Sequence, residues 1–253
     1  MTGMSMRKVT VASLLLLVGA SIAAATVDRS RTVETAKISQ KGKADLYARA
    51  YAATSVGIPR EDVDIIIARG MKRGGDAAEI GRFLDLCVNV KKQDLPVGPV
   101  LDRIVQGLSK RTPMIQINTA SQRLAEKETM ALPVVDAFLK QGMQGGKNNE
   151  REKAIEAVAR TFEQSVSRDS IAEIGSAVQK RQGSLSFFTD AVNSVTYLAA
   201  KGIPGEKASK MIANAVSSGA SEKDLDALVR QTKQPENDQN RWPDVDAAYD
   251  GHL

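Results

Sequence analysis

The chain has 253 residues, of which 42% are hydrophobic, 26% charged and 4% aromatic, and its formal net charge is +5. This composition excludes collagen-like, disulfide-rich and broadly disordered proteins, and so few aromatic residues disfavour a β-sandwich. One cysteine excludes an intramolecular disulfide and a cysteine-rich zinc site, and the one histidine, His252, excludes a histidine-based triad in a folded core. We therefore expect no cofactor and no metal site.

Residues 1–25 have the pattern of a secretory signal peptide. Arg7 and Lys8 precede an apolar stretch, and Ala23-Ala24-Ala25 supplies the small residues that cleavage requires. We expect a mature chain that begins near Thr26 in a periplasmic or secreted protein. The alternative is an uncleaved segment that anchors the chain in the membrane. No cysteine follows the apolar stretch, so a lipid-anchored lipoprotein is not expected.

The remaining chain divides into three parts by composition. Residues 26–43 are rich in Ser, Thr and Lys and are predicted to be a flexible leader, and residues 234–253 are predicted to be a flexible tail. Ala, Leu, Lys, Gln and Glu dominate residues 44–233, which we predict to be an all-α domain. Basic and acidic residues are interspersed, so we expect no nucleic-acid partner.

A short sequence step recurs along the predicted helical domain. Gly57-Ile58-Pro59 returns as Gly202-Ile203-Pro204, and Leu-Pro steps lie between them. Because proline is favoured at the first position of a helix, we take these steps as helix starts. The prolines of these steps, Pro59, Pro96, Pro133 and Pro204, are the anchors, and Ser167 is added because it stands at a similar spacing between the last two. They predict five tandem helix-turn-helix units of about 36 residues, stacked as an α-solenoid or an irregular helical array.

Apolar residues follow the anchors at the spacing of one helix face. Those four positions after an anchor are Val63, Val100, Ile171 and Ala208. If the units are equivalent, Ile66 and Met211 should both be buried in first helices, and Ile80 and Leu225 in second helices. In the third unit the stripe that contains Val135 slips out of this register, which indicates an irregular packing joint.

Glycines and capping residues mark the expected helix ends. The glycines that stand where a left-handed cap favours glycine are Gly74-Gly75, Gly145-Gly146, Gly183 and Gly219. Thr112-Pro113 is predicted to begin the second helix of the second unit. Residues 44–56 are predicted to be the second helix of an incomplete leading unit.

The two-helix unit resembles α-helical repeat scaffolds in general. The Trp, Leu-Gly and Tyr positions of tetratricopeptide repeats are absent. The Gly-Ile-Pro boundary is similar to the one between pentatricopeptide units, which belong to organellar RNA binders, whereas this chain carries an export signal. We therefore assign no family. The general resemblance implies an extended surface on which a protein or peptide can lie.

Basic pairs follow several of the expected helix ends. They are Lys72-Arg73, Lys91-Lys92 and Lys110-Arg111. Positive charge is favoured there by the helix dipole, which gives the pairs a structural explanation. If the repeats align these pairs on one side, they also form a ridge that binds an anionic polymer.

Acidic residues are candidates for acid and base in a glycosidase-like site. They are Glu61, Asp62, Asp64, Glu150, Glu152, Glu156, Glu222, Asp224 and Asp226. Most occupy first turns of expected helices, where negative charge is favoured, so we expect solvated helix starts. Cys87 lies on an apolar helix face without a histidine to activate it, and we expect it to pack in the core.

Trp242 and Tyr249 stand in the predicted tail as a possible short docking motif. Taken together, the sequence predicts an exported, non-catalytic helical-repeat binding or scaffold protein of the cell envelope, with a protein or peptide partner. The first alternative is an envelope enzyme that uses a carboxylate pair. The second is a protein that binds a polyanion or envelope polymer through its basic helix ends.

Overall fold

The computed structural model describes residues 39–145 and 149–232. The expected signal peptide, most of the expected leader, and the tail with Trp242 and Tyr249 lie outside these residues. The described residues form helices joined by short turns and include no strand, although Gln144 and Ser184 form an isolated bridge. The all-α prediction is confirmed.

Ten helices account for most of the described residues. They are α2 (Gln40–Ser55), α3 (Arg60–Lys72), α4 (Ala77–Lys92), α5 (Val97–Ser109), α6 (Met114–Lys140), α7 (Glu150–Glu163), α8 (Arg168–Lys180), α9 (Leu185–Ala200), α10 (Gly205–Ser217) and α11 (Glu222–Gln231). Helix α2 begins at Gln40 rather than at residue 44, because Ser39 caps it by accepting a hydrogen bond from the Gly42 amide (3.1 Å).

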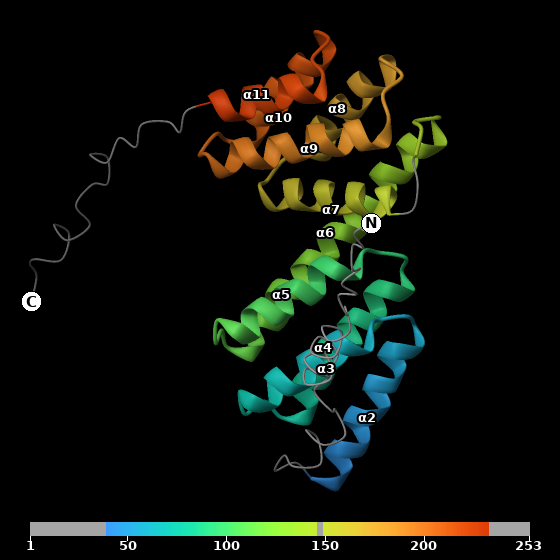
Figure 1. Ribbon diagram of the computed structural model, residues 1–253, viewed down its shortest axis with the longest axis vertical. Helices are drawn as coiled ribbons and strands as arrows, with labels where there is room; N and C mark the ends of the chain where they lie inside the picture. Colours follow the sequence, from blue (N-terminus) through green and yellow to red (C-terminus); the bar gives the residue numbers. More distant parts are fainter. Residues whose placement is uncertain (1–38, 146–148, 233–253) are drawn as a thin grey trace, which may run out of the picture.

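The helices pack in two rows (Figure 1). In one row α2 contacts α4, and the contacts continue in order through α6, α7, α9 and α11. In the other row α3 contacts α5, and α8 contacts α10. The rows pack against each other, and their buried apolar side chains form one continuous cluster from Leu46 in α2 to Leu225 in α11.

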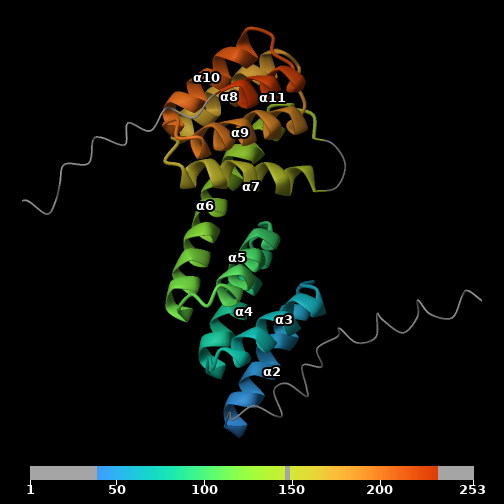
Figure 2. The same cartoon turned by 60° about the vertical axis from the view of Figure 1, so that its left-hand side comes forward.

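Helix α6 joins a half formed by α2–α5 to a half formed by α7–α11 (Figures 1 and 2). It packs against α4 and α5 in the first half and against α7 and α8 in the second. The rings of Phe138 in α6 and Phe188 in α9 add a further contact, with centroids 5.3 Å apart. Helix α6 is therefore the joint of the molecule.

The turns between the helices follow one pattern. After each helix from α2 to α10, the second residue past the helix has a positive φ. The next amide then donates to a carbonyl five residues back, as from Ile58 to Ala53 and from Ile203 to Leu198, both at 3.2 Å. Gly74 and Gly219 have such a left-handed conformation, as predicted, since glycine adopts it at little cost. The predicted caps at Gly145 and Gly183 are wrong, because the left-handed residues after α6 and α8 are Gly142 and Gln182.

Most of the predicted register agrees with the structure. The anchors that directly precede helices are Pro59, Pro96, Ser167 and Pro204. Their prolines occupy the N-cap, one position before the predicted one. The residues four positions further, Val63, Val100, Ile171 and Ala208, are all buried. Ile66, Ile80 and Leu225 are buried as expected, whereas Met211 is only partly buried.

The prediction that Pro133 starts a helix is wrong. Pro133 lies inside α6, a helix of 27 residues that begins directly after Thr112-Pro113 and continues through the predicted turn. Ala131 stands where Gly57 takes its left-handed conformation in the first unit, and alanine strongly favours the helix instead. Two predicted helices are therefore fused into one.

Candidate functional site

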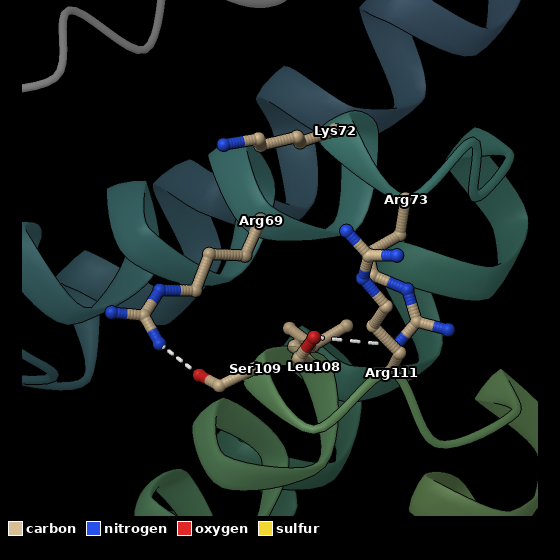
Figure 3. A pocket seen from close by; sticks show the side chains of 6 residues that line it. All are labelled: Arg69, Lys72, Arg73, Leu108, Ser109 and Arg111. Carbon is tan, nitrogen blue, oxygen red and sulfur yellow. Dashed lines mark hydrogen bonds between the residues drawn. The ribbon is translucent and has the colours of Figure 1, made fainter.

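Four basic side chains surround a hollow between the ends of α3 and α5 (Figure 3). The lining residues are Arg69, Lys72, Arg73, Leu108, Ser109 and Arg111. The hollow has a volume of about 780 Å³, and none of its lining residues is acidic. We call this site the basic hollow.

Helix geometry explains why these side chains meet. Arg69, Lys72 and Arg73 are three and four positions apart, so they project from one side of the end of α3. Helices α3 and α5 lie side by side, and α4 returns the chain between them, so both helices end at the same edge of the molecule. This arrangement brings Arg111, which follows α5, to the end of α3.

Two of the four cations hold α3 against α5. The Arg73 guanidinium donates to the carbonyl oxygens of Leu108 (3.2 Å) and Thr112 (3.1 Å) at the end of α5. Arg69 donates to the Ser109 hydroxyl. The last carbonyls of a helix carry partial negative charge, so these contacts are favourable and structural.

Lys72 and Arg111 remain available to a ligand. In the described part of the chain, neither forms an ion pair or a side-chain hydrogen bond. Like charges gathered without a carboxylate repel each other, and an anion in the hollow relieves that repulsion. Guanidinium and ammonium groups together suit phosphate, sulfate or carboxylate oxygens.

Three of the six basic residues indicated by the sequence meet in the basic hollow, namely Lys72, Arg73 and Arg111. Lys110 is exposed at the C-cap of α5 and does not line it. Lys91 and Lys92 end α4, which runs in the opposite direction, so they lie roughly 20 Å away along the helix axis. A single ridge through all six residues is therefore not formed. Arg69 is a further member, and its spacing from Lys72 is the signal that would have found it.

A second hollow, of about 270 Å³, lies between α7 and α9. Its charged lining residues are Glu150, Lys153, Glu156, Arg160 and Asp190. Burial, followed by the negative charges of Glu222 and Asp226, raises the pKa of Asp190 to about 6. The sequence did not indicate Asp190, because it lies in the middle of an apolar helix rather than in a first turn.

Most other acidic candidates stand at helix starts, as expected, but Asp64 is buried on α3 rather than solvated. Glu61 and Asp62 lie in the first turn of α3, and Glu222 and Asp224 in that of α11. Asp224 accepts a hydrogen bond from the Ser221 amide at 2.8 Å, and hydrogen bonds from Ser221 lower the pKa of Asp224. Asp224 and the N-cap residue Ser221 therefore form a capping box at the start of α11.

Cys87 and Glu128 are both fully buried. Cys87 packs in the core, as predicted, and burial, followed by the charge of Asp62, raises the pKa of its thiol to about 12. Glu128 lies on the buried face of α6, and neither of its carboxyl oxygens has a hydrogen-bond partner. The sequence analysis missed Glu128, although its place between Leu124 and Ala131 in the apolar stripe would have indicated its burial.

Within residues 39–145 and 149–232, no three His, Cys, Asp or Glu side chains gather as a possible metal site. No helix in those ranges has the length and hydropathy needed to cross a bilayer. Comparison with protein-family models, with curated proteins and with solved structures gives no match.

Proposed function

We propose that this chain is a non-catalytic helical-repeat binding protein whose basic hollow takes an anionic group of its partner. The basic hollow carries the proposal, because it gathers four cations and no carboxylate among its lining residues. Lys72 and Arg111 are not needed to hold the helix ends and can bind oxygen atoms of a ligand.

The helix lengths support tandem units. Helices α3, α5, α8 and α10 each have 13 residues. Helices α2, α4 and α9 each have 16 residues. Such a regular alternation of short and long helices is expected when one two-helix unit is repeated. The fused helix α6 then marks the junction where the regular pattern is interrupted.

Equivalent arginines support the same conclusion. Arg73 donates to Leu108 across 35 residues of sequence at 3.2 Å, and Arg181 donates to Val216 across 35 residues at 3.1 Å. Each arginine follows a 13-residue helix and binds the end of the next 13-residue helix, α5 for Arg73 and α10 for Arg181. The contact therefore belongs to the packing of neighbouring units.

The comparison of these two sites separates structural charge from surplus charge. Arg69 stands four residues before Arg73, and the residue four before Arg181 is Ala177. Likewise, the residue that corresponds to Arg111 at the second site is Gly219. Neighbouring units therefore pack without cations at those two positions. Arg69 binds the Ser109 hydroxyl, and Lys72 has a basic counterpart in Lys180, which precedes Arg181. Arg111 is therefore the cation with neither a packing contact nor a counterpart in the second site, which favours a binding role for it.

The partner we propose is an anionic polymer or an acidic segment of an envelope protein. The experiment measures binding of the purified chain to polyphosphate and to polyglutamate, as phosphate and carboxylate probes. The test variant is Lys72→Glu with Arg111→Glu. The control is Lys91→Glu with Lys92→Glu, which makes the same change in net charge at the other end of the helix pair.

We expect the test variant to lose about tenfold or more in affinity for at least one probe, and the control to stay close to the original chain. Affinity of the original chain should fall steeply with salt, and less steeply in the test variant, because fewer counterions are released. Equal loss in both variants, or no loss in the test variant, would contradict a site at the basic hollow.

A second candidate function is acid–base chemistry at the hollow between α7 and α9. The observation that favours it is the pKa of Asp190, raised to about 6 by burial and by Glu222 and Asp226. A carboxyl group of that pKa suits a general acid. The test compares release of reducing sugar ends from envelope polysaccharide by the original chain and by Asp190→Asn. Equal activity of both proteins would dismiss this candidate.

Export is also part of the proposed function and rests on the sequence of residues 1–25. N-terminal sequencing of the protein from fractionated cells should find a chain that begins near Thr26 outside the cytoplasm. A soluble cytoplasmic chain with Met1 intact would refute export. That result would leave the anion-binding proposal standing.

A further inference from the structure

Glu128 is a buried acid that the proposed function does not use. Its side chain is 0% exposed, and both carboxyl oxygens are buried without a hydrogen-bond partner. A buried carboxylate without partners is disfavoured, so burial favours the neutral form of the group in the folded protein. It lies on the face of α6 that also carries Leu124 and Ala131, in the middle of the joint between the two halves.

The charges around Glu128 come from both halves of the molecule. Arg103 of α5 acts on it electrostatically, as do Glu156 and Glu163 of α7. Among the described residues, no charged group of α4 or α8, which also pack against α6, acts on Glu128. Burial, followed by the charge of Glu156, raises the pKa of Glu128 to about 8, and Arg103 opposes this shift.

The same arginine ties the halves together. Arg103 donates to both carboxylate oxygens of Glu163, at 2.8 Å and 3.1 Å, and so links α5 to α7 across α6. An ionised Glu128 would repel Glu156 and Glu163 and would compete with Glu163 for Arg103. Its negative charge therefore acts against the contact of α7 with the first half.

We propose that the proton on Glu128 controls how tightly α7 packs against α5 and α6 at the joint. The neutral side chain allows α5, α6 and α7 to pack together, and loss of its proton accompanies the separation of α7 from α5 and α6. Opening of the joint exposes the carboxyl group to water, where its pKa returns toward the ordinary value of 4.5. Opening therefore releases one proton, and a rise in pH favours it.

The sign and range of the effect follow from the two pKa values. Below pH 4.5 the carboxyl group is protonated in both the closed and the open state, so pH has no effect through it. Between pH 4.5 and about 8 the closed state holds one proton more, so the opening constant rises about tenfold per pH unit. Above about pH 8 both states are ionised and the opening constant levels off.

Hydrogen exchange of the purified chain tests this joint. Protection of the α6 and α7 amides is measured by mass spectrometry from pH 5 to 9 and corrected for the intrinsic pH dependence of exchange. The test variant is Glu128→Gln, which keeps the shape of the side chain and cannot ionise. The control is Glu126→Gln, an exposed position on the same helix.

We expect protection in the original chain and in Glu126→Gln to fall about tenfold per pH unit up to about pH 8. Glu128→Gln should show no such fall. Identical pH profiles of all three proteins would overturn the proposal.

A second variant remains informative if Glu128→Gln does not fold. Glu163→Gln removes one repelling charge and leaves Arg103 to pair with Glu128, so the profile should level off at a lower pH. A purely structural loss of the Arg103–Glu163 ion pair would lower protection at all pH values without moving that point. An unmoved levelling point would therefore also overturn the joint. None of these results depends on the basic hollow.

Discussion

Two Leu-Pro steps of this chain have opposite structures. At Leu95-Pro96 helix α4 has ended, and α5 begins directly after the proline. At Leu132-Pro133 helix α6 continues without interruption. The step alone therefore does not decide whether the chain turns.

The residue before the step differs between the two sites. Asp94 adopts a left-handed conformation with φ 58°, and the following Leu95 amide donates to the Val90 carbonyl at 3.2 Å, which closes the end of α4. Ala131 is helical and fully buried, and alanine pays a steric cost in the left-handed region while it favours the helix. A Leu-Pro step thus marks a turn where the residue before it can leave the helix.

The largest expected effect is loss of apolar side chains from the buried face of α3. Ile66 is fully buried in α3, so Ile66→Ala removes packed methyl groups and should cost about 2 to 5 kcal/mol of unfolding free energy. Met211 has the matching position in α10 but is only partly buried, so Met211→Ala should cost less. Urea denaturation of both variants measures these costs.

Two exposed positions, one residue after Pro59 and three residues after Pro204, serve as controls for this pair. Arg60→Ala and Lys207→Ala change side chains on the polar faces of α3 and α10 and should cost under about 0.5 kcal/mol. If Ile66→Ala is as mild as these controls, the register of the repeated unit is wrong.

The two Leu-Pro steps should respond to proline replacement with opposite signs. Pro133 lacks an amide to donate to the Thr129 carbonyl within α6, and proline in a helix interior costs about 3 kcal/mol relative to alanine. Pro133→Ala should therefore stabilise the protein by about 1 to 3 kcal/mol.

Pro96 instead precedes α5 with φ −67°, a value that its ring fixes in advance. Pro96→Ala gives freedom to the unfolded chain and should destabilise the protein by about 0.4 to 1 kcal/mol. Thermal unfolding of both variants gives the two signs. Destabilisation by Pro133→Ala would mean that α6 depends on its proline.

The far end of the fused helix should respond less strongly than the buried apolar face of α3. A Cβ atom on Gly175 of α8 would lie 2.0 Å from the Phe138 ring of α6, which also packs on Phe188. Gly175→Ala should cost about 1 to 2 kcal/mol, since the clash exceeds the gain in helix propensity.

Gly98 of α5 is the matched control, because a Cβ atom there meets nothing within 4 Å. Gly98→Ala should be neutral or stabilising by up to about 1 kcal/mol. Equal melting temperatures for the two alanine variants would show that α8 and α6 do not pack as closely as Gly175 permits.

Much of the fold could be predicted because its signals are local. The apolar stripe around Ile66 and Ile80 has helical period, and capping residues such as Ser167 satisfy amides of their own first turn. Such interactions involve residues a few positions apart, so composition and spacing reveal them.

The candidate site could be predicted only in part, because it joins residues that are distant in sequence. The sequence by itself indicated Lys72, Arg73 and Arg111 as basic residues at helix ends. Only the tertiary structure decided that the ends of α3 and α5 meet, so that Arg73 binds the Leu108 carbonyl while Lys92 lies at the other edge.

Tertiary structure also decided the course of α6 and the state of Glu128. The sequence at Pro133 carries a turn signal, but α6 packs against α5 and α7, and the burial of Ala131 stabilises the continuation of the helix. Glu128 is one acid among many in the sequence, and its pKa is raised to about 8 because two neighbouring helices exclude water from it. Helix formation here is local and visible in the sequence, whereas burial and charge pairing depend on which helices pack together.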